Sequence, residues 1–184
     1  MKRIIIVHGW GGSPNDNWLP WLKTKLEELG HKVVVPSMPD ADNPVIEKWV
    51  GKLAEVVGMP DAETYLIGHS IGCQTILRYL ETINTRIGGA IFVAGWFNLE
   101  NLETNGERRL AEPWLKTSID ISKVKSVLPK STLVISYNDD YGAFEENKQK
   151  FSEFVTKTVV LHQAGHIVDL VVPEILMEAK SLLQ

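Results

Sequence analysis

Short apolar runs alternate along the chain with longer stretches in which apolar residues recur at helical spacing. The short runs are rich in Ile and Val and lack polar alternation, a pattern typical of strands buried on both faces of a sheet. We expect strands at residues 3–8, 32–36, 64–69, 87–94, 132–137 and 157–162, and helices near residues 17–29, 44–57, 71–84, 122–128, 144–155 and 170–183. This alternation predicts an α/β fold, with a mostly parallel sheet of about six strands flanked by helices.

The least regular segment covers residues 97–130 and contains the polar, turn-rich stretch "NLENLETNGERRLAEPW". We expect it to form surface loops and short helices over one end of the sheet, and it is too short for a large cap domain. A chain of 184 residues without an internal repeat or linker predicts a single domain spanning residues 1–184.

Charge and hydropathy narrow the class of protein. The net charge is −4, from 19 basic and 23 acidic residues, and the basic residues form no run or stripe that would follow a phosphate backbone, so we expect no nucleic-acid partner. No apolar segment approaches the roughly 20 residues of a membrane span. The single cysteine, Cys73, excludes an intramolecular disulfide and fits a small buried side chain in a reducing compartment. We therefore expect a cytoplasmic protein that does not bind membranes.

The stretch Gly68-His-Ser-Ile-Gly72 lies between an expected buried strand and an expected helix. A serine at such a turn projects from the carboxyl end of the strand, and the flanking glycines leave room for the neighbouring strand and helix. The pattern Gly-x-Ser-x-Gly in this context predicts a nucleophile elbow with Ser70 at its tip. The alternative is an ordinary strand-turn-helix joint with a capping serine.

A serine hydroxyl needs a base, and the base needs an orienting carboxylate. Where a nucleophile elbow carries the serine, the three residues are expected to follow one another along the chain in the order serine, acid, histidine. Asp139 and Asp140 follow one expected strand, and His166 follows the next, just after a glycine that lets its ring reach back over the sheet edge. Successive residues at a strand end point in opposing directions, so one aspartate can face His166, and the sequence alone selects neither.

A second histidine, His162, precedes His166 by four residues, a spacing that also suits two metal ligands on a helix. Gly165 and the transition from strand to loop argue against a helix there. We therefore expect no metal site and assign His162 to the end of the strand.

The loop after the first expected strand, "VHGWGGSPNDNW", offers a second element of catalysis. The backbone N–H groups of Trp10 and of Ile71, which follows the serine, are expected to form an oxyanion hole. A dinucleotide-binding loop is the alternative, but Pro14 occupies the position of its third glycine and there is no phosphate-loop lysine. The sequence therefore indicates no cofactor.

The tryptophans divide into two groups. Those within expected helices suit packing, whereas those beyond the carboxyl ends of strands suit the walls of a substrate pocket. The second group adds Trp96 and Trp114 to Trp10 as candidate pocket residues.

Several stretches together resemble the family of small α/β-hydrolases similar to retinoblastoma-binding protein 9 and YdeN. They are "NDNWLPWLKTKLEELG", "VPSMPDADNPVIEKW", "YLIGHSIGCQTILRYLE", "VAGWFNLEN", "EPWL", "ISYNDDYGAF" and "AGHI", and they cover nearly the whole chain. The resemblance implies an α/β-hydrolase fold with Ser70 as nucleophile, His166 as base and Asp140 as acid. The Leu-x-Cys-x-Glu peptide that would dock a retinoblastoma-type protein is absent, so we expect no such partner.

These observations predict a serine hydrolase that cleaves small acyl esters or thioesters through an acyl-enzyme, with a small-molecule acyl substrate as its partner. The alternative is a protein that keeps this fold but serves as a catalytically idle binding module for another protein.

Overall fold

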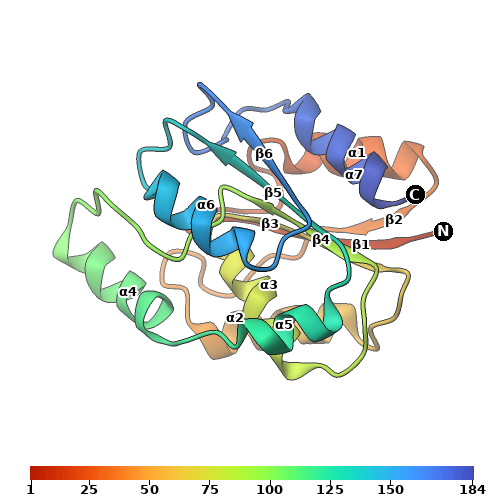
Figure 1. The fold of residues 1–184 in the computed structure, drawn as a ribbon, viewed down its shortest axis with the longest axis horizontal. Helices are drawn as coiled ribbons and strands as arrows, with labels where there is room; N and C mark the ends of the chain where they lie inside the picture. Colours follow the sequence, from red (N-terminus) through yellow and green to blue (C-terminus); the bar gives the residue numbers. More distant parts are fainter.

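One sheet of six parallel strands, in the order β2-β1-β3-β4-β5-β6, forms the centre of the molecule (Figure 1). The computed structural model describes residues 1–184. The strands are β1 (Arg3–Val7), β2 (Lys32–Val34), β3 (Thr64–His69), β4 (Gly89–Val93), β5 (Ser131–Ser136) and β6 (Lys157–Leu161). Strands β3, β4 and β5 are buried along their whole length, as their unbroken apolar runs predict.

Helices cover both faces of the sheet (Figure 1). They are α1 (Leu19–Glu28), α2 (Ile46–Val57), α3 (Ile71–Thr82), α4 (Asn105–Lys116), α5 (Ile121–Val127), α6 (Phe144–Ser152) and α7 (Pro173–Leu182). The buried side chains of α1 and α7 pack in one apolar cluster, and those of α2, α3, α5 and α6 pack in another on the opposite face. Burial on both faces explains why the central strands carry apolar residues at successive positions.

Every expected strand and helix is present, with ends that shift by a few residues. The segment of residues 97–130 differs most from expectation, because it contains the 12-residue helix α4 in addition to α5. Thr104 begins α4 with a capping box, in which its hydroxyl accepts from the Glu107 N–H and the Glu107 carboxylate accepts from the Thr104 N–H. This cap stabilises a helix that is rich in charged residues.

Strands β1 and β3 are neighbours, but the chain leaves β1 toward β2 on one side and leaves β3 toward β4 on the other. Connections that diverge in this way open a crevice at the carboxyl ends of the two strands, where parallel α/β sheets bind ligands. The loop from Gly9 and the turn at Ser70 begin at this point.

Candidate active site

Ser70 occupies a strained turn between β3 and α3. Its backbone angles are φ 54° and ψ −120°, a conformation that non-glycine residues rarely adopt. The two glycines around it make the turn possible, since a Cβ at Gly68 would lie 2.7 Å from the Cys73 nitrogen and a Cβ at Gly72 would overlap the Val7 carbonyl oxygen. The structure therefore confirms the geometry expected of a nucleophile elbow.

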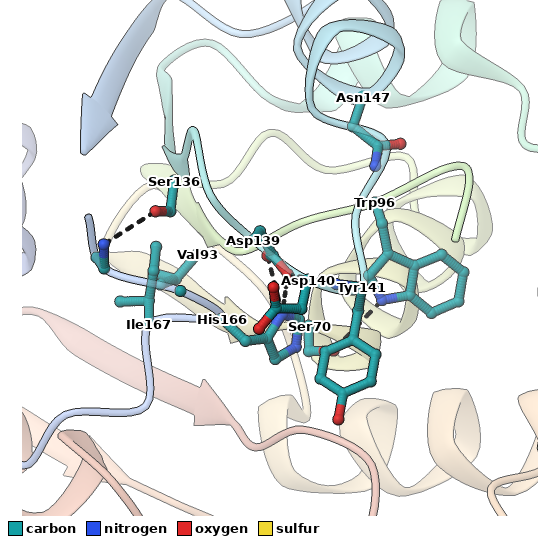
Figure 2. Close-up of polar contacts among 12 residues, drawn as sticks. Ser70, Val93, Trp96, Ser136, Asp139, Asp140, Tyr141, Asn147, His166 and Ile167 are labelled. Carbon is teal, nitrogen blue, oxygen red and sulfur yellow. Dashed lines mark hydrogen bonds and ion pairs between the residues drawn. The ribbon is translucent and has the colours of Figure 1, made fainter. Parts of the chain in front are cut away.

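The loop after β6 brings His166 to an aspartate of the loop after β5. The His166 Nδ1 lies 2.9 Å from Oδ2 and 3.0 Å from Oδ1 of Asp139 (Figure 2). The Asp139 side chain is only 4% exposed, and its Oδ1 also accepts from the Tyr141 N–H at 3.0 Å. The carboxylate is thus fixed from two directions and can hold the imidazole in one orientation.

The prediction that Asp140 would face His166 is wrong. Asp140 is exposed, and its polar contact runs through its carbonyl oxygen, which accepts from the Asn101 side chain at 2.8 Å. Strand β5 ends at Ser136, and residues 137–138 form a turn before the two aspartates. The strand's alternation therefore stops too early to decide which carboxylate points toward the histidine.

The Ser70 side chain lines the same cavity as His166, and its hydrogen bond is made to a different residue (Figure 2). The Trp96 indole N–H donates to the Ser70 Oγ at 3.3 Å, and no hydrogen bond joins that oxygen to His166. A hydroxyl has one proton to donate and two lone pairs to accept with. Accepting from Trp96 therefore leaves the Ser70 proton free for the imidazole, and catalytic hydrogen bonds often shorten only when substrate binds.

The two candidate oxyanion donors lie at this same edge. The backbone N–H of Trp10 makes no hydrogen bond in the structure, and that of Ile71 is the first of α3, where no preceding helical turn supplies an acceptor. The Trp10 loop is held in place because the Gly11 N–H donates to Ala41 and the Trp10 indole donates to the carbonyl of Asp42. Both groups are thus placed for the expected role, which remains a prediction.

A cavity of about 560 Å³ opens beside the elbow. Its size falls within the roughly 300–1,000 Å³ of small-molecule sites. Ser70, His166, Trp10 and Trp96 line it, as do several apolar residues that the sequence did not single out: Leu19, Leu99, Leu102, Leu110, Tyr141 and Val168. Of these, Tyr141 lies in the same loop as Asp139, and its ring packs edge-on against His166 with centroids 5.2 Å apart.

The expectation that Trp114 would line the pocket is wrong. Its side chain is 2% exposed and belongs to the apolar core rather than to the cavity. The Trp114 indole N–H donates to the Pro44 carbonyl at 3.0 Å, and its ring packs edge-on against Trp49. Trp114 therefore anchors α4 to the loop before α2, while the first residues of α4 and the preceding loop form the cavity wall.

The charged side chains that line the cavity are acidic. Asp16, Asp42 and Glu107 contribute carboxylates, and no lysine or arginine lines it. Glu107 belongs to the α4 capping box, and its hydrogen bonds to Thr104 keep its pKa below the ordinary value. The cavity therefore presents negative charge at neutral pH.

The thiol of Cys73 lies outside this chemistry. It is fully buried in α3 with its Sγ within hydrogen-bond distance of the carbonyl oxygens of Gly68 and Val93, and burial raises its pKa. Such a thiol is protonated at neutral pH and is a poor nucleophile. His162 is exposed beyond the end of β6, and no group of three or more His, Cys, Asp or Glu side chains is placed to hold a metal ion. None of the helices is long and apolar enough to cross a membrane.

Comparison with known proteins identifies relatives along most of the chain. The sequence model of the family described as serine hydrolase matches residues 4–170. The chain is 28% identical over 170 residues to YdeN of Bacillus subtilis strain 168, a match that covers 91% of this chain and 87% of that protein. It is 25% identical over 187 residues to the serine hydrolase RBBP9 of Rattus norvegicus, with 98% of this chain and 95% of the relative covered. These matches confirm the resemblance inferred from the sequence motifs.

Solved structures show the same fold. The ydeN gene product of B. subtilis superimposes with a TM-score of 0.89 at 24% identity, covering 99% of this chain and 98% of that one. Est1E of Butyrivibrio proteoclasticus, whose structure has ferulic acid bound, superimposes with a TM-score of 0.78 at 15% identity, covering 100% and 88% of the two chains. The α/β-hydrolase fold is thereby confirmed.

Proposed function

The chain belongs to the serine hydrolase family, and from this premise we propose that it cleaves small acyl esters or thioesters through an acyl-enzyme on Ser70. His166 is the general base, and Asp139 is the acid that orients it. The observation that carries the proposal is the Asp139–His166 pair, which lies at the same cavity as the strained Ser70 turn. These three side chains come from the carboxyl ends of three different strands.

In the first half-reaction, His166 removes the proton from Ser70 as the oxygen attacks the substrate carbonyl. The imidazolium that forms lies against the buried Asp139 carboxylate, which stabilises its charge and keeps Nδ1 protonated. Protonated His166 then donates its proton to the leaving alcohol or thiol. In the second half-reaction, water activated by the same histidine releases the acid and restores Ser70.

Three N–H groups suit the charge that develops during attack. The N–H groups of Trp10 and Ile71 are free to donate to the oxyanion of the tetrahedral intermediate. Trp96 donates to the Ser70 Oγ and so supports the attacking oxygen as it loses its proton. Removing one oxyanion donor typically costs about 10²–10³ in kcat, which shows how much such contacts contribute.

The dimensions and lining of the cavity favour small substrates without negative charge. Its volume of about 560 Å³ suits an acyl chain of modest length, and its carboxylates oppose an anionic group. We expect short-chain p-nitrophenyl esters to be hydrolysed with kcat/KM about tenfold higher than the palmitate ester.

A panel of p-nitrophenyl esters from acetate to palmitate tests the proposed function, with Ser70→Ala as the matched blank. The expected result is turnover that saturates with substrate and disappears in the Ser70→Ala protein. If the wild-type protein hydrolyses none of the esters faster than the variant, the alternative of a catalytically idle binding module is favoured instead.

A further inference from the structure

The loop that carries His166 is bent in a way that needs support. Gly165 and Ile167, on either side of the base, both have positive φ, of 51° and 55°. A positive φ is unusual for any residue with a Cβ and is a true outlier for a β-branched residue, so this backbone conformation is energetically unfavourable. Ile167 is fully buried, so contacts around the loop must offset this strain.

Two ring N–H groups hold consecutive carbonyl oxygens of this loop. The His69 Nε2 lies 2.9 Å from the His166 carbonyl oxygen, and the Trp18 Nε1 donates to the Ile167 carbonyl oxygen at 3.0 Å. The rings of His69 and Trp18 pack edge-on against each other, with centroids 5.8 Å apart. We call this pair of rings, with the two carbonyls they hold, the loop clasp.

His69 is well suited to this contact because it is the residue before the nucleophile. It ends β3, is 3% exposed, and its ring lies 5.2 Å from the ring of His166. Burial, followed by the nearby charge of His166, lowers the pKa of His69 to about 4. The other ionisable groups that act on it are Asp139 and His8. A neutral imidazole carries one proton, and the carbonyl beside Nε2 requires that proton on Nε2.

The second nitrogen of His69 supports this assignment. Nδ1 is buried without a hydrogen-bond partner, and a Cβ added at Gly9 would lie 3.0 Å from it. No acceptor lies within hydrogen-bond distance of Nδ1, which agrees with the ring proton being on Nε2, where the His166 carbonyl accepts it. A neutral ring also adds no positive charge beside the imidazolium that forms during catalysis.

We propose that His69 and Trp18 are positioning residues that place the base relative to the nucleophile. His69, the residue before Ser70, holds the His166 carbonyl oxygen, and Trp18 holds the Ile167 carbonyl oxygen. This inference rests on the proposed function. The side chain of Asp139 orients the imidazole ring, whereas the loop clasp places the backbone that carries the ring. An error of about 1 Å in such placement can cost about 10²-fold in rate.

Paired substitutions at His69 test the clasp. The amide nitrogen of Gln reaches the position of Nε2, whereas that of Asn reaches only the position of Nδ1. His69→Gln should keep kcat for a short p-nitrophenyl ester within about threefold of wild type, and His69→Asn should lower it at least about tenfold with KM little changed. Equal kcat in the two variants, or a loss confined to KM, would overturn the proposal.

Trp18→Phe tests the second contact of the loop clasp, the hydrogen bond to the Ile167 carbonyl oxygen. It also provides a test if the His69→Asn protein does not fold. It removes the N–H but keeps an aromatic ring against His69, and we expect kcat to fall about three- to tenfold with KM little changed. An unchanged kcat in a folded Trp18→Phe protein would overturn the part assigned to Trp18.

Hydrogen exchange separates the clasp from the proposed function. The peptide covering residues 163–168 should exchange faster in His69→Asn and Trp18→Phe than in wild type or His69→Gln, whether or not the protein turns over an ester. Unchanged exchange in both would overturn the clasp itself. If exchange is faster in these variants but the wild-type protein has no esterase activity, the clasp stands and the proposed function is rejected.

Discussion

Replacing Asp139 by asparagine should nearly abolish turnover, whereas the same change at Asp140 should have little effect. The new amide side chain keeps the shape of the original but loses the negative charge that lies 2.9 Å from the His166 Nδ1. That carboxylate is 4% exposed, so water cannot replace it when the imidazolium forms. The neighbouring Asp140 is exposed and contributes only its carbonyl oxygen, which the substitution retains.

The magnitude follows from the role of the buried charge. Neutralising a triad aspartate with little change of shape costs about 10⁴ in kcat, which corresponds to about 5.5 kcal/mol of transition-state stabilisation. We expect a loss of that order for Asp139→Asn and a change of less than about threefold for Asp140→Asn, within the range of an ordinary surface substitution.

The assay is steady-state hydrolysis of a short p-nitrophenyl ester at neutral pH, with the two variants as a matched pair. Circular dichroism and thermal melting confirm that each variant is folded. A larger loss of kcat in Asp140→Asn than in Asp139→Asn would refute the assignment of Asp139 as the acid.

Three further predictions concern stability and specificity. Because burial lowers the pKa of His69 from 6.5 to about 4, the unfolded chain binds a proton that the folded chain does not, and stability should be lost as pH falls below about 6.5. The contribution of His69 to the free energy of unfolding should fall by on the order of 2 kcal/mol between pH 7 and pH 5, so urea titrations should show a smaller fall in His69→Gln than in wild type; equal falls in the two proteins would contradict the reasoning. Gly72→Ala should unfold the protein or lower its free energy of unfolding by more than about 3 kcal/mol, because the new Cβ overlaps the Val7 carbonyl oxygen. Gly51→Ala, on an open face of α2, should instead raise the free energy of unfolding by about 0.5–1 kcal/mol. An ester bearing a carboxylate, such as a hemisuccinate, should have a kcat/KM at least about threefold lower than an uncharged ester of equal length at low salt. The two kcat/KM values should approach each other as salt is added; a difference that does not change with salt would indicate that the shape of the substrate, rather than its charge, is responsible.

The sequence predicted those parts of the fold that depend on local patterns. The buried strands are recognisable by uninterrupted Ile and Val runs, and Ser70 stands out because its two glycines serve a turn that tolerates no side chain beside the neighbouring backbone. His166 could be chosen over His162 because a glycine precedes it at the end of a strand. Each of these inferences needs only a few consecutive residues.

The features of the site that the sequence did not predict depend on contacts between segments far apart in the chain. The choice between Asp139 and Asp140 depends on a turn after β5 that no periodicity describes, and the family resemblance pointed to the wrong one as the partner of His166. Trp114 packs against the loop before α2 because α4 turns that face inward, which its position in the sequence does not reveal. The support of the His166 loop by Trp18 joins residues 149 positions apart.

Covalent labelling with a fluorophosphonate probe, followed by peptide mapping, tests the central claim most directly. The probe phosphonylates a serine only where an activated oxygen and a base lie together, and Cys73 is too deeply buried to compete. We expect one adduct per chain, located on Ser70, and none in the Ser70→Ala protein. An adduct that persists in Ser70→Ala, or that maps to another residue of the wild-type chain, would contradict the assignment of Ser70 as the nucleophile.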